Sequence, residues 1–322
     1  MATSSSFSSV SVIVPARNEA SCIAPTVRAI IDQSTATCGV EVIVVDDAST
    51  DDTVRSARDA GARVIEMADS GGNPAAARNR GAKAATGDPL IFLDADCQVA
   101  DGWLDAFLDA HRAGETIVAG SLDLPAGLGV TAQCDYYCGW YMVHPDRPAG
   151  YVPHAPAPNL SVRRDAFFTS SGFEELPYSI ASEERVWQAE LRNKGHRIYF
   201  EPRARAYHFN RPGLANLLRR SYRWGYAAIR SKNQSGTARL AWLYRYPRLL
   251  IVASIPLAFV HTVYILACWL RAGVYRPLLM LPLVLLSRLA YGVAMMTGGI
   301  RWLRERKADI RPGEQGTESD PH

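Results

Sequence analysis

Several features that would define other classes of protein are missing from this sequence of 322 residues. The formal net charge is only +3, far from the dense Lys/Arg excess of a dedicated nucleic-acid-binding protein, so we expect no nucleic-acid partner. No G-x-G-x-x-G motif follows a predicted strand, which argues against a dinucleotide-dependent dehydrogenase. There is also no internal repeat and no low-complexity segment beyond the polar ends.

The cysteines lack the paired spacing of a disulfide framework or of a four-ligand zinc site, which favours reduced thiols. Cys134 and Cys138 have the i, i+4 spacing of a helix but no companion pair, so core packing is the better interpretation. The N-terminus has no basic region, and its first apolar run ends at Pro15, too early for a signal peptide. We therefore expect the N-terminal part of the chain to lie in the cytoplasm.

Residues 10–120 alternate short apolar runs with amphipathic stretches, a pattern that predicts an α/β fold with a mostly parallel, Rossmann-like sheet. Strands are predicted at 10–14, 41–45, 63–66, 89–93 and 116–119, and helices at 20–32, 50–59, 74–85 and 102–111. Residues 120–172 are rich in Gly, Pro and aromatic residues and are too irregular to assign, as substrate-shaping loops often are. A helix at 183–194 and a strand at 197–200 follow.

The C-terminal third contains two long apolar segments. Residues 249–270 carry no formal charge and are long enough to cross the ~30 Å hydrocarbon layer of a membrane. Residues 278–300 are of similar length, but Arg288 lies at their middle, where an isolated charge costs about 2.5–3.5 kcal/mol on insertion. We expect this segment to span as well, with a buried or re-entrant segment as the alternative. Basic residues flank both outer ends, which predicts a hairpin with both ends in the cytoplasm.

A basic, amphipathic stretch precedes the two apolar segments. Residues 214–229 mix leucines and aromatic residues with Arg219, Arg220 and Arg223, which fits either a helix at a membrane interface, with arginines toward lipid phosphates, or an ordinary packed surface helix. The apolar segments that follow favour the first. The sequence therefore divides into a catalytic domain (1–210), basic interface helices (211–247), a transmembrane hairpin (248–301) and a polar cytoplasmic tail (302–322).

Two carboxylates, Asp94 and Asp96, directly follow the apolar run 90–93, where a parallel strand is predicted to end and where open α/β sheets bind ligands. An extended backbone would point both side chains the same way. Such a pair attracts Mg²⁺ or Mn²⁺, which keep coordination positions for water and substrate phosphates and so suit a nucleotide diphosphate. Taken alone the D-x-D pattern is common, and a solvated turn is the alternative.

Four segments in one order give this pair a larger context: VIVPARNEA, VVDDASTDDT, AAARNRGAKAATGD and SEERVWQAELRNKGHRIYFEPRARAYH. Together they resemble the inverting glycosyltransferases of family 2, which adopt the GT-A nucleotide-sugar-binding fold, over residues 10–208. The resemblance implies a metal-dependent transfer of a sugar from a nucleotide diphosphate sugar, UDP-linked, to an acceptor. With the predicted hairpin, we expect the sugar to go to a hydroxyl or phosphate of a membrane lipid or a cell-envelope glycan, at the cytoplasmic membrane.

The resemblance also implies a binding site for the nucleotide sugar. Asp47 would recognise the base, and the neighbours of the nucleotide would be Pro15, Ala16, Arg17 and Glu19. The chemistry agrees, because a carboxylate can accept the imide N–H of uracil, and backbone amides at helix N-termini favour anions. The alternatives are that Asp46 or Asp47 only caps the following helix, and that Arg17 and Glu19 only pair with each other.

Catalysis would need further residues. Arg78 matches the arginine of the family's Arg-Asn pair, and we expect it to support the site rather than contact the ligand directly. An inverting transfer requires a base for the acceptor hydroxyl. The family's Glu-Asp pair is replaced here by Glu183-Glu184, so Glu184 is the expected base and Glu183 the alternative; a merely acidic first helical turn is the non-catalytic interpretation. His208 matches a histidine of many relatives and is a candidate metal ligand or diphosphate donor, or else a structural residue.

Of the two aspartates, Asp96 is the expected direct metal ligand, while Asp94 would face the sugar, the ribose or a metal-bound water. Two other functions remain compatible with such a fold: a catalytically silent nucleotide-binding membrane protein, and a nucleotidyltransferase. A nucleotidyltransferase would carry a Gly-rich, basic phosphate loop directly after the first strand. That place is taken by PARNEA, which argues against it.

Overall fold

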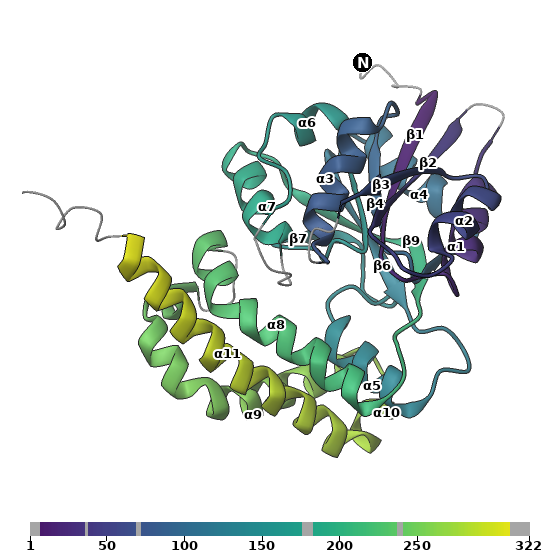
Figure 1. Ribbon diagram of the computed structural model, residues 1–322. Helices are drawn as coiled ribbons and strands as arrows, with labels where there is room; N and C mark the ends of the chain where they lie inside the picture. The colour runs from purple at the N-terminus through teal and green to yellow at the C-terminus, as the bar shows by residue number, and fades with distance from the viewer. Residues whose placement is uncertain (1–6, 36–37, 69–71, 176–182, 237–240, 310–322) are drawn as a thin grey trace, which may run out of the picture.

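The computed structural model describes residues 7–35, 38–68, 72–175, 183–236 and 241–309. Figure 1 shows a sheet domain with a group of long helices packed at one end of it. The strands are β1 (Ser9–Ala16), β2 (Gly39–Asp47), β3 (Arg63–Met67), β4 (Leu90–Leu93), β5 (Cys97–Val99), β6 (Ile117–Asp123), β7 (Gly150–Val152), β8 (Asn159–Val162) and β9 (Ile198–His208). The predicted α/β class is therefore confirmed.

The strands form one mixed sheet in the order β3-β2-β1-β4-β8-β6-β9-β5, with β7 paired to β9. Strands β3, β2, β1 and β4 are mutually parallel, so their carboxyl ends meet at one edge of the sheet. Residue Ala16 at the end of β1 is level with Asp46 of β2, and β4 ends beside them. The predicted ligand residues that follow these strands are brought together by this register.

Helices α1 (Ile23–Ile31), α2 (Thr53–Asp59), α3 (Pro74–Ala84) and α4 (Trp103–Arg112) cover the sheet. Helix α3 begins at Pro74 as predicted, and the side chain of Asn73 caps it by accepting hydrogen bonds from the amides of the second and third residues. Helix α2 begins at Thr53, three residues later than predicted. The residues just before the helix contact the segment after β1 instead, because the amide of Thr50 donates a hydrogen bond of 2.8 Å to Oδ1 of Asn18.

The region 120–172, which the sequence left unassigned, contains β7, β8 and two helices, α5 (Val130–Gly139) and α6 (Arg164–Phe168). Strand β8 lies in the middle of the sheet between β4 and β6 and is antiparallel to both. Its first residue, Asn159, is buried, and its amide donates to the carbonyls of Ser121 and Ala204 and accepts from Trp103 Nε1. Strand β9 is longer than predicted because it pairs with β5, β6 and β7 in turn.

Helix α7 (Glu184–Asn193) precedes β9, and the C-terminal third forms α8 (Leu214–Ser235), a 3-10 turn (Ala241–Arg245), α9 (Pro247–Arg271), α10 (Arg276–Leu279) and α11 (Leu281–Asp309). Among the described residues, α9 and α11 are long and apolar enough to cross a membrane. Large apolar side chains are exposed on both helices, among them Val252 (80%) of α9 and Leu281 (44%) of α11. Arg288 is an exception on α11: it is 2% exposed and donates to Ser221 of α8.

Helices α8 and α11 pack backbone to backbone at glycines. A Cβ atom added to Gly225 of α8 would lie 2.2 Å from the carbonyl oxygen of Tyr291, and one added to Gly298 of α11 would lie 2.1 Å from that of Tyr226. No side chain fits at these distances, so the two helices can approach this closely only because both positions are glycine.

We expect Gly225→Ala to destabilise the protein, although alanine favours an isolated helix by about 1 kcal/mol. The added methyl group must push α8 from α11, and such overpacking costs about 1–3 kcal/mol. Thermal unfolding of the full chain in detergent measures the effect. Gly39→Ala is the matched control, because its nearest neighbour would lie 3.9 Å away. Equal stability of the two variants would show that the helices separate without cost.

Candidate active site

A cavity of about 1350 Å³ opens where the carboxyl ends of the parallel strands meet the C-terminal helices. It brings together residues from β1, β2, α3, α7, β9 and the turn after β4. All eleven residues that the sequence predicted for the site line it: Pro15, Ala16, Arg17, Glu19, Asp47, Arg78, Asp94, Asp96, Glu183, Glu184 and His208. The cavity also takes in residues of α5, α8, α9 and α11, which the sequence did not connect with the site.

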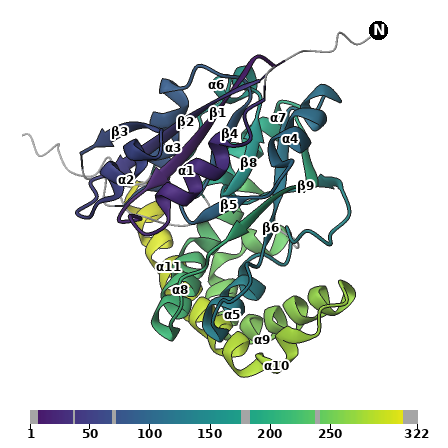
Figure 2. The same ribbon diagram turned by 90° about the vertical axis from the view of Figure 1, so that its right-hand side faces the viewer.

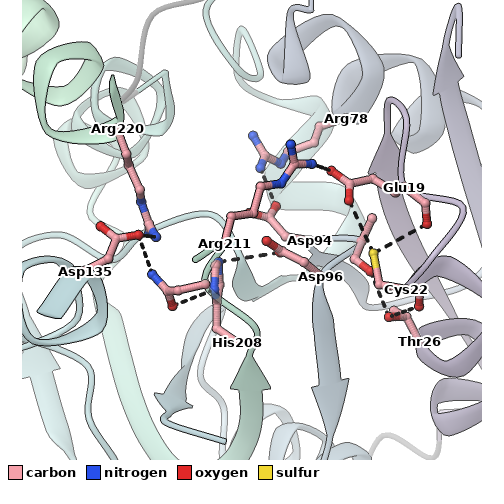
Figure 3. A network of polar contacts seen from close by, with 12 residues as sticks. Glu19, Cys22, Thr26, Arg78, Asp94, Asp96, Asp135, His208, Arg211 and Arg220 are labelled. Atoms are coloured by element: carbon pink, nitrogen blue, oxygen red, sulfur yellow. Dashed lines mark hydrogen bonds and ion pairs between the residues drawn. The ribbon is translucent and has the colours of Figure 1, made fainter. Parts of the chain in front are cut away.

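At the edge formed by β1 and β2, Asp47 forms an ion pair with Arg17, with 3.4 Å between Oδ2 and Nη1. Glu19 instead pairs with Arg211, which follows β9 (Figure 3). The alternative that Arg17 and Glu19 pair with each other is therefore wrong. Asp46 holds the turn after β2 by accepting a hydrogen bond from the amide of Ser49, while Asp47 lines the cavity.

The Asp94-Ala95-Asp96 segment is a turn rather than an extended strand end. The amide of Cys97 donates to the carbonyl of Asp94 at 3.1 Å, which closes the turn and leads directly into β5. Helix α1 also holds this turn, because the carbonyl of Ala95 accepts a hydrogen bond of 2.8 Å from Oγ1 of Thr26. The expectation of an extended backbone was wrong here, yet both aspartates line the cavity.

Asp96 meets His208 across the strand pair β5 and β9, with 3.5 Å between Oδ1 and Nε2 (Figure 3). Together with the thiol of Cys97 they form a group whose ligand atoms all lie within 4.8 Å of one another. Carboxylate and imidazole suit Mn²⁺ or Mg²⁺ better than a thiol does, because these hard cations prefer oxygen ligands. Asp94 is not part of this group among the described residues, since it faces Arg78 instead.

His208 is oriented by a chain of polar groups behind it (Figure 3). Its Nδ1 lies 3.0 Å from Asn210 Oδ1, and the amide nitrogen of Asn210 donates to Asp135 at 2.7 Å. Arg220 of α8 donates to the same carboxylate at 2.6 Å. Because the amide oxygen can only accept, the histidine donates from Nδ1, and Nε2 is the ring nitrogen that faces Asp96. Partners of this kind commonly orient metal-binding histidines.

Arg78 joins the two acidic parts of the site. It is only 3% exposed, donates to Asp94 at 2.7 Å and forms a second ion pair with Glu183. The neighbouring Asn79 holds the chain before α7 through the backbone of Phe173. Arg78 thus ties the turn after β4 to the start of α7, in keeping with a supporting role.

The two glutamates at the start of α7 differ in their partners. Glu183 is bound by the guanidinium of Arg78, whereas Glu184 lies 2.7 Å from Nε2 of His154. Burial raises the pKa of Glu183, against the opposing charge of Arg78. Burial also raises the pKa of Glu184 above the ordinary 4.5, and it holds the pKa of His154 well below 6.5, with help from nearby Arg185. The imidazole of His154 is therefore neutral at neutral pH, and with its proton on Nε2 it donates a hydrogen bond to Glu184.

This pairing gives a prediction for the pH dependence of turnover. A base must be ionised, so activity should fall as the pH drops through the raised pKa of Glu184. His154→Phe removes a donor to the carboxylate and should move this acid limb to higher pH, with little change on the alkaline plateau. His154→Gln keeps a hydrogen-bond donor to Glu184, so it should bring the acid limb of the pH profile back toward the pH seen in the parent protein. A loss of activity that is equal at every pH would contradict the assignment.

Several residues of the site carry no signal that sequence inspection can detect. His154 is a lone histidine in an irregular loop, Asp135 lies on a helix far along the chain from both Asp96 and His208, and Arg220 lies on the helix that follows β9. Trp140 packs on the ring of His208 and lines the cavity, but Trp187 is fully buried against phenylalanines of the core. Only contact between β9, α5 and α8 in the folded chain identifies these residues.

The parallel edge of the sheet, the acidic turn after β4 and the long cavity are those of an α/β domain with the GT-A fold. Two crystal structures share this fold. TarS of S. aureus (residues 1–349 in complex with UDP-GlcNAc) has a TM-score of 0.51 and 18% identity, with 92% of each chain covered. GalNAc-T7 with UDP, GalNAc and Mn²⁺ has a TM-score of 0.51 and 17% identity, with 75% of this chain and 54% of that chain covered.

Residues 11–167 match the family described as Glycosyl transferase family 2, so the chain carries a domain of this family. The pre-mycofactocin glycosyltransferase of Mycobacterium tuberculosis is 30% identical over 259 residues, 73% of this chain. The chain spans about half, 52%, of the length of that relative. Glycosyltransferase AglE of Haloferax volcanii is 28% identical, with 68% of this chain and 73% of the relative covered. The resemblance read from the sequence motifs is confirmed.

Proposed function

We propose that this protein is a metal-dependent inverting glycosyltransferase that transfers a sugar from a UDP-linked donor to a membrane lipid or cell-envelope glycan. The observation that supports the proposal is the shared cavity, whose lining includes a carboxylate and a histidine suited to a metal ion, Asp96 and His208, and a further carboxylate suited to act as a base, Glu184. The UDP-GlcNAc in the TarS structure supports the choice of nucleotide, because the two chains share a fold.

Asp96 and His208 would hold the metal ion, Mn²⁺ or Mg²⁺. Their geometry fits the role, because Nε2 of His208 lies 3.5 Å from Oδ1 of Asp96 and both residues line the cavity. Asp94 lines the same cavity and would bind a metal-bound water or the sugar. A bound cation of this kind stabilises the negative charge of the departing diphosphate. Mn²⁺ in the GalNAc-T7 structure supports a divalent ion.

Other side chains around the cavity would bind the nucleotide and the diphosphate and accept the proton of the acceptor. Arg17 and Asp47 would hold the base of the nucleotide at the edge of β1 and β2. Arg219 and Arg223 of α8 line the same cavity and add positive charge where the diphosphate must lie. The acceptor hydroxyl attacks the anomeric carbon as the bond to the diphosphate breaks, and Glu184 takes the hydroxyl proton. Attack opposite the leaving group inverts the configuration.

We further propose that α9 and α11 span the cytoplasmic membrane. Both helices expose several large apolar side chains, as the core helices of a soluble protein do not. Exposed aromatic residues lie near the helix ends, namely Trp242 and Tyr246 before α9 and Tyr275 before α10. Tryptophan and tyrosine are enriched at the two surfaces of a bilayer. The buried position of Arg288 removes the main argument against a second span, because its charge faces α8 rather than lipid.

Topology mapping tests this arrangement. With the catalytic domain in the cytoplasm, a reporter fused within 271–276 should report the opposite side, and one fused after 309 should report the cytoplasm. An alkaline phosphatase and a fluorescent protein reporter at each position make the comparison independent of expression level. A cytoplasmic signal from the loop between α9 and α10 would show that the hairpin does not cross.

Incubation of membranes that contain the protein with a panel of nucleotide sugars, followed by mass analysis of the extracted lipids, tests the activity. We expect a new lipid with one added sugar mass, formed from a UDP sugar and only with a divalent cation. Membranes from cells that lack the protein are the control. Binding of UDP without any turnover across the panel would instead indicate a catalytically silent nucleotide-binding protein.

A further inference from the structure

The cavity that holds the proposed donor site continues past the sheet domain, between α8, α9 and α11. Its walls there include Lys232 of α8, Tyr244 of the 3-10 turn, and His261, Arg288 and Tyr291 of the two apolar helices. None of these residues belongs to the edge of β1 and β2 that would hold the nucleotide (Arg17 and Asp47), here called the donor edge. None belongs to the metal group (Asp96, Cys97 and His208) either. This end of the cavity forms a second compartment, and the side chains that line it differ from those around the proposed donor site.

Two cations face this compartment without a carboxylate. Lys232 Nζ donates to the hydroxyls of Tyr244 at 3.3 Å and Tyr291 at 3.2 Å. Arg288 donates to Ser287 and Ser221, and its Nε has no hydrogen-bond partner. Within the part of the chain that the structure describes, neither cation forms an ion pair, and no residue of α9 or α11 that lines the cavity is acidic. Buried charge of one sign is costly unless an opposite charge joins it.

The groups in the compartment identify the charge that would join them. An ammonium, a guanidinium and hydroxyls that can donate form a set suited to the oxygens of a phosphate group. The walls beside them are apolar: Leu257, Ala258 and Val260 of α9 and Met295 of α11 line the same space. Val260 is also exposed on the outer surface of α9, so the apolar wall continues onto the proposed lipid-facing side of the hairpin.

We propose that Lys232 and Arg288 form a subsite for the acceptor, which binds the phosphate group of a phosphate-bearing lipid while its hydrocarbon chain leaves along α9 and α11. The proposal rests on the proposed function, because it names the class of acceptor. The phosphate is recognised and not consumed. A hydroxyl of the same lipid forms the new bond to the anomeric carbon, the bond from that carbon to the donor diphosphate breaks, and the proton passes to Glu184.

The position of Lys232 connects this subsite to the base. Its charge is close enough to contribute to the lowered pKa of His154, after burial and Arg185, and His154 contacts Glu184. A phosphate on Lys232 therefore lies within electrostatic range of the pair that takes the acceptor proton. A lipid held at this point would present the part next to its phosphate to Glu184.

Lipid binding without donor tests the subsite directly. The full chain in an uncharged detergent is titrated with dioctanoyl phosphatidylglycerol and followed by native mass spectrometry. The same titration with dioctanoylglycerol, which lacks the phosphate, and with inorganic phosphate, which lacks the chains, separates the two parts of the ligand. We expect the phospholipid to bind at least about tenfold more tightly than either, because charge-assisted hydrogen bonds and apolar burial each contribute. Inorganic phosphate that binds as tightly as the lipid would overturn a lipid acceptor.

Variants locate the binding on the two cations. Lys232→Met and Arg288→Met should each weaken phospholipid binding about tenfold or more, while UDP binding stays unchanged. Tyr291→Phe removes only a hydroxyl and should cause a smaller loss with the fold intact, which covers the case that Arg288→Met fails to fold. Arg248→Gln removes a charge from an exposed position at the start of α9 and should bind lipid like the parent.

Parent-like binding by both methionine variants, or an equal loss in Arg248→Gln, would overturn the subsite. These outcomes differ from failure of the proposed function. Intact lipid binding with no sugar transfer from any donor would contradict the activity alone. If sugar transfer occurs but the Lys232→Met and Arg288→Met variants bind lipid like the parent, only the proposed subsite is contradicted.

Discussion

Replacing Glu184 with glutamine should lower the rate of sugar transfer by about 10²–10⁴-fold, the range that a positioned base contributes. Glutamine keeps the size of the side chain and can still accept a hydrogen bond from His154, so the donor site should remain formed. Steady-state kinetics together with UDP binding by calorimetry separate the two effects. We expect kcat to fall while the affinity for UDP changes little, because Glu184 acts on the acceptor and not on the nucleotide.

Glu183→Gln is the matched control, one residue away on the same helix. Glu183 is bound to Arg78, so its removal leaves a buried guanidinium with one ion-pair partner fewer and should lower stability by about 1–3 kcal/mol. The expected signature is a lower thermal midpoint with a smaller loss of kcat than in Glu184→Gln. A larger loss of kcat in Glu183→Gln, at equal stability, would assign the base to Glu183 instead.

Asp96→Asn should reduce metal-dependent turnover by at least about 100-fold, because a bound cation stabilises the leaving diphosphate by several kcal/mol and each 1.36 kcal/mol changes the rate tenfold. The amide is a neutral and weaker ligand of similar shape. Binding of Mn²⁺, followed by electron paramagnetic resonance without any substrate, should weaken in parallel, and His208→Ala should show the same two losses.

Asp101→Asn provides the comparison for Asp96→Asn, because Asp101 lies just after β5, at the other end of that strand from Asp96, and is exposed. It should bind Mn²⁺ and turn over donor like the parent protein. Unchanged turnover and unchanged Mn²⁺ binding in Asp96→Asn would show that the metal lies elsewhere. Loss of turnover with normal Mn²⁺ binding would mean that Asp96 contacts the sugar donor and not the metal.

The donor edge could be predicted from the sequence because its geometry follows from periodicity. Apolar runs that alternate with amphipathic stretches specify parallel strands, and the residues after such strands must meet at one edge. Arg17, Asp47 and Asp94 needed no further information to be placed near one another. The candidate metal ligand His208 is different, because it is distant in sequence from Asp96 and was identified only through resemblance to a family.

The remaining parts of the site depend on which elements cover each other, and a local pattern does not contain this information. Asn159 appears unsuited to a central strand until Trp103, Ser121 and Ala204 are seen to satisfy its amide. Arg288 looks costly in an isolated apolar helix, yet α8 shields it with Ser221. The arginines of α8 were expected to face lipid phosphates, whereas the fold turns them toward the cavity that contains the donor edge.

Helix α8 belongs to both halves of the molecule. One side carries Arg220, which holds Asp135 in the cavity wall, and another touches the backbone of α11 at Gly225. Because α8 packs against both parts, we expect the active site to move together with the hairpin of α9 and α11. With the hairpin in a bilayer as proposed, the reacting centre stays at a constant height above the membrane surface. An enzyme built in this way selects acceptors by how far their hydroxyl projects from the bilayer, as well as by what they are.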